Sequence, residues 1–185
     1  GKAVDLRVWK PGGPLMSTKG ASTGLFGIEN IPKGKGTVYL CEGEWDTMAL
    51  SALAKKLKKD VCTVGVPGAG TFKKEWIAAL HNKNVIVLYD NDEAGENGER
   101  VVLNRLKGVA SSLQFIQWPG DVPDGFDVRD WVGYGLRLGK AEDSWTCLHK
   151  LLISNPRKAT PEEKSVARAV ENRNAQGPAN ADEVI

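Results

Sequence analysis

Acidic residues stand at the ends of two apolar runs in this chain. The run at 38–41 is followed by Glu42, and the run at 85–89 is followed by Asp90 and Asp92. Each run has the apolar, branched and aromatic content of a buried strand. Ligands of open α/β sheets bind at the carboxyl edge of the strands, so these three carboxylates are expected to meet there. Crowded carboxylates repel one another unless a cation lies among them, and a hard ion such as Mg²⁺ prefers oxygen ligands.

Ordinary structural roles are the alternative for several of these acidic residues. Glu44 and Asp46 fall in the first turn of the helix expected after Glu42, where acidic side chains favour the helix dipole. That role accounts for Glu44, and for Asp46 it stays open beside a role in the site. Asp90 and Asp92 also fit turn chemistry alone, because loops after strands commonly carry Asp.

Alternating strands and helices are needed to bring these residues together. Short connections between strand–helix–strand units indicate a right-handed, parallel arrangement with both faces of the sheet covered. The predicted fold class is therefore α/β, with a mostly parallel four-stranded sheet flanked by helices. Apolar periodicity predicts strands at 38–42, 61–66, 84–90 and 112–118, and helices at about 44–58, 72–82 and 93–107.

The segments that flank this core differ from it in composition. Residues 1–37 are rich in Gly, Pro and Lys and hold six basic and two acidic side chains. They are expected to form a loop-rich extension that could touch a polyanion, although a solvated surface explains the same charge. A further helix at about 143–153 completes the core domain, 38–154. Residues 155–185 are predicted to form one weak helix, signalled by the capping-box pattern at Thr160, and a disordered or linker tail.

Bulk composition is that of a soluble globular protein. The 185 residues are 41% hydrophobic and 26% charged, with a formal net charge of +2. No apolar stretch approaches the length of a membrane span and the start lacks a signal-peptide pattern, so a cytoplasmic location is expected. Cys41, Cys62 and Cys147 are widely spaced and odd in number, which indicates buried thiols in a reducing compartment and no zinc site.

Four short motifs follow successive strands in a fixed order. The motifs are Glu42-Gly43-Glu44-Trp45-Asp46, Gly65-Val66-Pro67-Gly68, Asp90-Asn91-Asp92-Glu93-Ala94-Gly95 and Asp127-Val128-Arg129-Asp130-Trp131. This series resembles the Toprim domain shared by DnaG-type primases, topoisomerases and some nucleases, over about 38–133. The lead-in around Met16–Gly20 and Leu25–Glu29 resembles the segment that joins the basic N-terminal subdomain to the Toprim core in bacterial and phage primases.

The resemblance to primases implies a nucleotidyltransferase of the DNA-directed RNA polymerase type, which makes RNA primers on single-stranded DNA. It implies a single-stranded DNA template, ribonucleoside triphosphates, and a replicative helicase in cis or in trans as partners, in a bacterial or phage-infected cell. No zinc-binding module or helicase motor is visible in the sequence. The chain is therefore expected to be one piece of a longer polypeptide or of an assembly.

The same resemblance assigns roles to the acidic residues. Glu42, Asp90 and Asp92 are implied to be catalytic and to hold Mg²⁺ or Mn²⁺, which binds the phosphates of the incoming nucleotide. The other acidic positions would bind a second ion or support the first, although helix capping accounts for Asp127 equally well. The complete set of implied metal ligands is Glu42, Asp46, Asp90, Asp92, Asp127 and Asp130.

Basic and glycine residues near the same sheet edge are candidates for contacts with nucleic acid or nucleotide. Backbone amides of the loop 67–71 could receive a phosphate, but the loop lacks the ending of a P-loop and a tight turn explains it equally well. The residue at position 19 matches a basic position of the primase lead-in, and an ordinary surface lysine is the alternative. Template contacts through lysine or arginine predict binding that weakens steeply with salt. The candidates are Lys19, Lys73, Lys74, Arg100, Gly68 and Gly70.

Other functions fit parts of the pattern. A metal-dependent Toprim nuclease, a topoisomerase fragment and a non-catalytic nucleic-acid-binding module share the same motifs. A topoisomerase needs a nucleophilic tyrosine, but Tyr39 and Tyr89 lie in predicted strands and Tyr134 follows the last motif. Phosphatases of the haloacid dehalogenase type also use Asp-x-Asp, but after the first strand of their core and not after the third.

Overall fold

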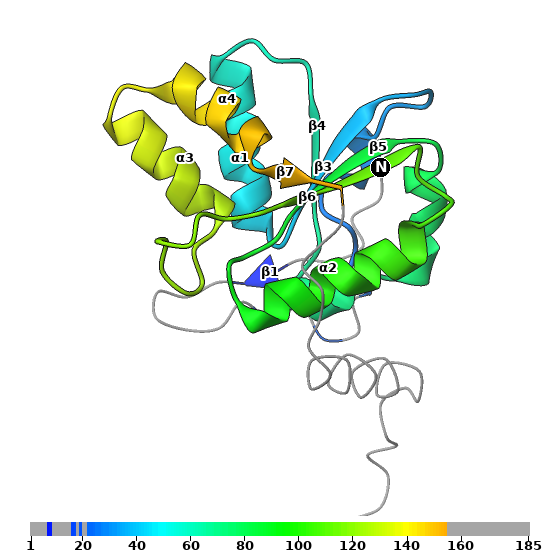
Figure 1. Ribbon diagram of the computed structural model, residues 1–185. Coiled ribbons are helices and arrows are strands. Elements are labelled where there is room, and N and C mark those ends of the chain that lie inside the picture. The colour runs from blue at the N-terminus through cyan, green and yellow to red at the C-terminus, as the bar shows by residue number, and fades with distance from the viewer. Residues whose placement is uncertain (1–6, 9–15, 18, 20–21, 155–185) are drawn as a thin grey trace, which may run out of the picture.

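A five-stranded sheet forms the centre of the computed structural model, which describes residues 7–8, 16–17, 19 and 22–154 (Figure 1). The strand order is β4-β3-β5-β6-β7. The first four strands of this order run parallel, and β7 pairs antiparallel with β6. The four predicted parallel strands are thus confirmed, with a short fifth strand at one edge. The strands are β3 (Thr37–Cys41), β4 (Cys62–Gly65), β5 (Asn84–Leu88), β6 (Ser112–Ile116) and β7 (Leu152–Ile153).

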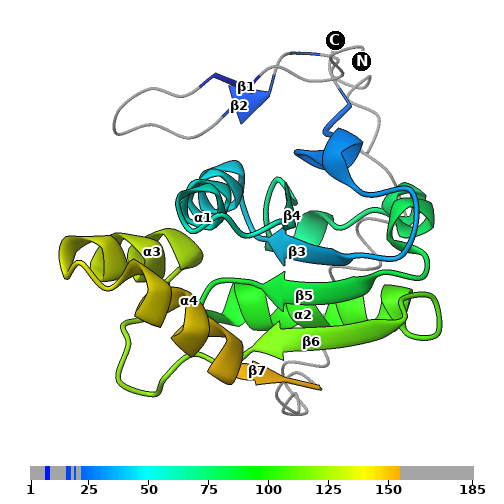
Figure 2. The ribbon, with the colours of Figure 1, turned by 90° about the horizontal axis from the view of Figure 1, so that it is seen from above.

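Helices cover both faces of the sheet (Figures 1 and 2). One face carries α1, α3 and α4, and the other carries α2 with two 3₁₀ segments, η2 and η3. This is the layered α/β arrangement that the sequence predicts. The helices are α1 (Glu44–Lys56), α2 (Glu93–Leu106), α3 (Val128–Arg137) and α4 (Ala141–Lys150), and the 3₁₀ segments are η1 (Ile28–Asn30), η2 (Ala69–Thr71) and η3 (Lys74–Leu80).

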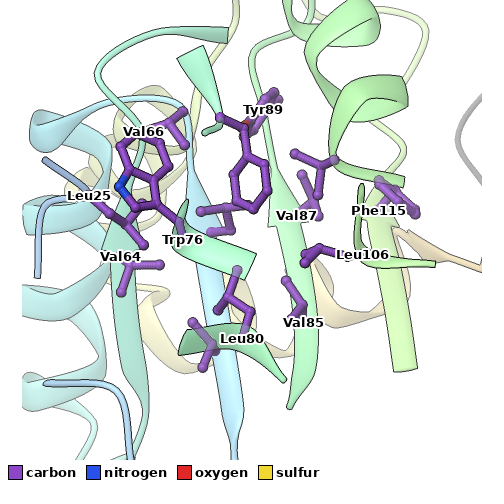
Figure 3. Packing of buried hydrophobic residues seen from close by; sticks show 14 of the residues in the cluster. Leu25, Val64, Val66, Trp76, Leu80, Val85, Val87, Tyr89, Leu106 and Phe115 are labelled. Atoms are coloured by element: carbon purple, nitrogen blue, oxygen red, sulfur yellow. The ribbon is translucent and has the colours of Figure 1, made fainter. Parts of the chain in front are cut away.

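Alternate residues of the central strands enter two separate cores. In β3, Val38 and Leu40 pack on the α2 face, whereas Tyr39 and Cys41 pack on the face of α1, α3 and α4. Figure 3 shows the first core, in which Val85 of β5 lies near Leu80 of η3 and Leu106 of α2. Because both faces are buried, the central strand β5 is apolar without a break from Val85 to Leu88, as is typical of parallel sheets.

Two predicted helices differ from the structure in type or extent. The segment predicted as a helix at 72–82 forms the 3₁₀ segment η3, from Lys74 to Leu80, a tighter turn that is common in short connections between longer elements. The helix predicted at 143–153 ends at Lys150. The residues after it leave the helix because they pair with β6, where the amide of Gln117 bonds to the carbonyl oxygen of Leu151 at 2.8 Å.

The flanking segments are described in part. Strands β1 (Arg7–Val8) and β2 (Met16–Ser17) form a small antiparallel pair, and Phe26 forms a bridge with Gly65 beside β4. The weak helix and tail predicted for 155–185 lie outside the described residues, as does most of 1–21. Across the residues that the structure does describe, no helix has the length and apolarity of a membrane span.

The three cysteines are free thiols, but they differ in exposure. Cys41 and Cys62 are buried in the sheet, as predicted. The prediction of a buried thiol is wrong for Cys147, which is exposed because it lies on the outer face of α4, away from the buried side chains of Trp145 and Leu148.

Candidate functional site

The first acidic pair is placed by the register of β3 and β5. Cys41 lies opposite Leu88 in this pair of parallel strands, so the residues that follow them emerge at the same edge of the sheet. There the backbone amide of Asp90 donates a hydrogen bond of 3.3 Å to Oε2 of Glu42. Both carboxylates are half-buried. The strand ends thus bring together two residues that are 48 positions apart, as predicted.

A loop-to-loop pairing carries the last motif to the same edge. Asn91 and Phe126 form an antiparallel bridge, in which the amide of Asn91 bonds to the carbonyl oxygen of Phe126 at 2.8 Å. The amide of Gly125 in turn bonds to the carbonyl oxygen of Asn91 at 2.9 Å, and the Asn91 side chain bonds to Pro123 at 3.1 Å. These bonds hold the loop before α3 against the loop after β5, so Asp127 lies near Asp90.

Asp46 and Asp127 join the first turns of α1 and α3. Asp127 is the N-cap of α3, and its Oδ1 accepts the amide of Asp130 at 2.7 Å. Its Oδ2 accepts Nη2 of Arg129 at 2.7 Å, and Oδ1 of Asp46 accepts the Arg129 amide at 3.1 Å. Asp46 and Asp127 are 7% and 5% exposed. Asp127 therefore both caps α3 and belongs to the group of acidic residues.

Mutual repulsion shows that the carboxylates share one region. Burial, with smaller contributions from the nearby charges of Glu42, Asp46, Asp127 and Asp92 in that order, raises the pKa of Asp90 to about 8. Burial is also the largest cause that raises the pKa of Glu42, to about 7, and the charges of Asp92 and Asp46 contribute to this rise. We call these five residues the acidic edge.

The acidic edge divides into two parts according to its partners. Asp46 has a pKa raised by burial and by Asp127, but the amide and the guanidinium of Arg129 act in the opposite direction. The pKa values of Glu42 and Asp90 are raised by burial and by neighbouring carboxylates. Arg129 therefore acts on the part of the acidic edge that is formed by Asp46 and Asp127.

Asp92 is turned toward the helix that follows it. It is the N-cap of α2, and its Oδ1 accepts the amide of Gly95 at 2.7 Å. A Cβ on Gly95 would lie 2.2 Å from the carbonyl oxygen of Asp90, so only glycine lets the helix start this close to the acidic edge. Asp92 influences both Asp90 and Glu42 electrostatically, while one of its oxygens serves the cap.

The donor set of the acidic edge fits a hard divalent cation. Its side chains offer only carboxylate oxygens, which Mg²⁺ and Mn²⁺ take as ligands. In the described conformation, no three His, Cys, Asp or Glu side chains of the described residues are close enough together to hold an ion. Ionised carboxylates repel one another, so such a group converges only when a cation compensates its charge.

A shallow recess opens beside Asp90. Its wall includes the carboxylates of Glu96 and Glu99 on α2 and the side chains of Gln117 and Trp118 after β6. The Trp118 indole donates a hydrogen bond of 2.8 Å to the carbonyl oxygen that precedes Asp90 in the chain. Glu96 in this wall is paired with Arg100, whose Nη2 lies 3.3 Å from Oε2 of Glu96.

The predicted glycine loop borders Glu42. Gly68 has φ 151°, a conformation that favours glycine, and it precedes η2. The amide of Ala69 acts to lower the pKa of Glu42, which places this amide at the carboxylate. Gly70 is exposed in the same turn. The loop therefore directs a backbone amide at the acidic edge, and the hydroxyl of Thr71 closes its turn by bonding to the Gly68 carbonyl at 2.6 Å.

The predicted basic residues have different surroundings. Nζ of Lys73 donates to the carbonyl oxygen of Thr23 at 2.7 Å and lies 5.5 Å from the ring centroid of Trp76, so it ties η3 to the lead-in. Lys74 is exposed. Arg100 bonds to Asn97 at 2.8 Å on its own helix.

Two further predicted residues lie at the surface. Lys19 is exposed in a turn of the lead-in. Asp130 is exposed on the first turn of α3. The residue that the sequence analysis missed is Arg129, which contacts both Asp46 and Asp127. The sequence feature that could have identified it is a basic residue between two acidic residues, Asp127 and Asp130, at the start of a helix.

Comparison with known proteins supports the architecture. A family model described as Toprim-like matches residues 39–131, which includes the acidic edge. The chain belongs to the Toprim-like family. Solved structures also share its fold, as the following comparisons show. A search of curated proteins finds no significant match.

Two solved structures from bacteriophage T7 resemble this Toprim-like chain. One is the primase fragment of the primase-helicase protein, with a TM-score of 0.55 and 19% identity over 78% of this chain and 56% of the fragment. The other is the lagging-strand DNA polymerase interacting with primase domains of two subunits bound to an RNA/DNA hybrid and dTTP. It matches with a TM-score of 0.54 and 17% identity over 83% of this chain and 72% of that chain. The Toprim-like chain thus spans little more than half of the T7 primase fragment.

Proposed function

We propose that this chain is the catalytic part of a DNA primase, which makes RNA primers on a single-stranded DNA template by nucleotidyl transfer. The observation that carries the proposal is the acidic edge, where residues from separate loops meet in a Toprim-like fold. The likeness of the fold to the T7 primase fragment favours primase over the other Toprim activities. Ribonucleoside triphosphates are the proposed substrates.

Mg²⁺ or Mn²⁺ is the proposed cofactor, with Glu42, Asp90 and Asp92 as the proposed ligands and catalytic residues. When bound, the ion would supply positive charge to the phosphates of the nucleotide and stabilise the charge that develops during transfer. Glu42 is already oriented by the amides of Asp90 and Ala69, which limits the rotation of its side chain. Partial burial of these carboxylates makes their interaction with a bound ion stronger than it would be in bulk water.

The other acidic residues take supporting roles in this proposal. Asp46 and Asp127 hold the first turns of α1 and α3 together across the acidic edge through Arg129. Asp130 is exposed and stays a candidate ligand of a second ion.

Nucleic-acid contacts and partners complete the proposal. Lys74 and Lys19 are exposed candidates for the template backbone, while Lys73 and Arg100 also make the structural contacts described above. The loop with Gly68 and Gly70 is a candidate for a phosphate contact.

We infer that a replicative helicase, in cis or in trans, works with this chain in the cytoplasm of a bacterial or phage-infected cell. The T7 structures, which comprise a fragment of a primase-helicase protein and primase domains bound to an RNA/DNA hybrid, support this inference.

The test compares E42Q and D90N with E93Q, a control acid that is exposed in the first turn of α2. Primer synthesis is measured with labelled ribonucleotides, single-stranded DNA, Mg²⁺ and an added replicative helicase. The two acidic-edge variants should lose at least about 100-fold in rate, because they remove charges that hold the ion. E93Q should retain the wild-type rate. Thermal unfolding confirms that each variant is folded.

Other outcomes redirect the assignment. Unimpaired synthesis by E42Q or D90N contradicts the proposed mechanism. Cleavage of labelled DNA without ribonucleotides indicates a nuclease. Failure of the wild-type protein to bind Mn²⁺ in calorimetry indicates a non-catalytic binding module.

A further inference from the structure

We propose that Arg129 binds the phosphates of the nucleotide at the acidic edge. This inference rests on the proposed function, because it requires a polyphosphate ligand to lie over these carboxylates. The ligand class is a nucleoside triphosphate with its divalent ion, and the contact is from the guanidinium to phosphate oxygens.

Two acidic residues hold Arg129 in place. Its Nη2 donates to Oδ2 of Asp127 at 2.7 Å, and its backbone amide donates to Oδ1 of Asp46 at 3.1 Å. Both acids are buried, and Asp127 also caps α3 through its other oxygen. The arginine is therefore anchored at its backbone and at one end of its side chain, which lowers the entropy that it loses on binding a ligand.

The guanidinium has capacity for a second anion. Arginine has five N–H donors, and the side-chain bond to Asp127 uses one of them. The Arg129 side chain is 58% exposed, whereas that of Asp127 is 7% exposed. The planar donor fork that remains at the surface matches phosphate oxygens.

The position of Arg129 in its helix is unfavourable without a compensating anion. Arg129 is the second residue of α3, where the helix dipole disfavours a positive charge. Asp127 compensates part of this cost as a local partner. A helix-stabilising role alone would be served better by an acidic or neutral residue there, so the cation at this position indicates a role outside the helix.

Other cations near the sheet edge are directed elsewhere. Lys73 is bound to the carbonyl oxygen of Thr23, and the Arg100 side chain, 12% exposed, bonds within α2. Arg129 contacts the acidic edge through both its backbone amide and its guanidinium. A triphosphate that approaches these carboxylates would meet this guanidinium beside Asp127.

The experiment compares R129Q, R129K and R137Q. Arg137 is an exposed arginine in the last turn of the same helix and serves as the matched control. ATP binding in the presence of Ca²⁺, and Mn²⁺ binding without nucleotide, are each measured by calorimetry. R129Q should weaken ATP binding about 10- to 100-fold, R129K should weaken it less, and R137Q should stay within about twofold of wild type.

Mn²⁺ binding separates this inference from the proposed function. R129Q should bind Mn²⁺ at least as tightly as wild type, because removal of a cation leaves the carboxylates freer to hold one. Wild-type ATP affinity in R129Q, or an equal loss in R137Q, overturns the role of Arg129 and leaves the metal site standing. Absence of both Mn²⁺ and ATP binding in the wild-type protein overturns the proposed function and this inference together.

Discussion

The amide of Asp90 bonds to Oε2 of Glu42 at 3.3 Å, across the carboxyl ends of two adjacent parallel strands. This bond keeps the Glu42 carboxylate beside the residue that carries the next acidic side chain. Burial and mutual repulsion then oppose ionisation of both groups, so their pKa values rise to about 7 and about 8. Ionisation of these two acids therefore destabilises the fold, and a bound cation would reduce the repulsion between them.

Stability without divalent ions should fall as the pH rises from about 4 to about 8. An exposed carboxyl ionises near pH 4, so across this window the unfolded chain loses protons that folded Glu42 and Asp90 keep. The melting temperature in EDTA should therefore decrease with rising pH, by roughly 5 °C or more at pH 8 relative to pH 5. Thermal unfolding at one-unit pH steps measures this dependence.

The double variant E42Q/D90N isolates the contribution of the two acids. Its melting temperature should depend less on pH than that of wild type, while E93Q should follow wild type. Addition of Mn²⁺ at pH 8 should raise the melting temperature of wild type and not of the double variant. An equal pH dependence in the wild-type protein and the double variant would contradict the assigned coupling.

Much of the fold could be predicted because both faces of the sheet are buried. Continuous apolar runs such as 85–89 cannot be amphipathic, so they marked the parallel strands correctly. Strand β7 was missed because Leu152 and Ile153 continue the apolar spacing of the helix before them. Their pairing with β6 is a tertiary contact that local pattern does not contain.

The acidic edge could be predicted in outline because parallel strands place their carboxyl ends together. That rule brought Glu42 and Asp90 to one edge from separate segments. It could not predict that Oδ1 of Asp92 serves the cap of α2, or that Arg129 joins two of the acids. Such contacts depend on side-chain geometry and on loop pairing, which spacing in a sequence does not determine.

G95A should destabilise the protein, whereas G133A should not. A Cβ at Gly95 would lie 2.2 Å from the carbonyl oxygen of Asp90, so the start of α2 must move. A Cβ at Gly133 would have the flexible end of the Arg137 side chain as its nearest contact, at 3.4 Å. We expect G95A to cost about 1–3 kcal/mol of unfolding free energy. G133A should be neutral or gain up to about 1 kcal/mol, since alanine favours a helix interior. Urea denaturation of both variants checks this, and equal effects would contradict the close approach of α2 to Asp90.

Y89F should be at least as stable as wild type, in contrast to Y39F. The Tyr89 hydroxyl is buried and has no hydrogen-bond partner in the part of the chain that the structure describes. The Tyr39 hydroxyl bonds to Nε2 of His149 at 2.8 Å. Loss of an unsatisfied hydroxyl should change stability by between zero and about +1 kcal/mol, and loss of the bonded one should cost about 1 kcal/mol. Urea denaturation measures both, and a larger loss for Y89F than for Y39F would show that the Tyr89 hydroxyl has a partner in solution.

Variants of the neighbouring residues Lys73 and Lys74 should distinguish a structural contact from a contact with nucleic acid. Lys73 is bound to Thr23 and packs near Trp76, so K73Q should cost about 1 kcal/mol of stability through loss of the tether between η3 and the lead-in. Lys74 is exposed, so K74Q should change stability by less than about 0.5 kcal/mol.

If Lys74 contacts the template backbone, K74Q should weaken binding to single-stranded DNA uniformly across sequences and reduce the salt dependence by about one phosphate contact. Fluorescence anisotropy over a salt series measures both quantities, with K140Q, an exposed lysine between α3 and α4, as the control. Equal salt slopes for K74Q and wild type would show that Lys74 does not contact the nucleic acid. A loss of stability in K74Q as large as that in K73Q would contradict the exposed position of Lys74.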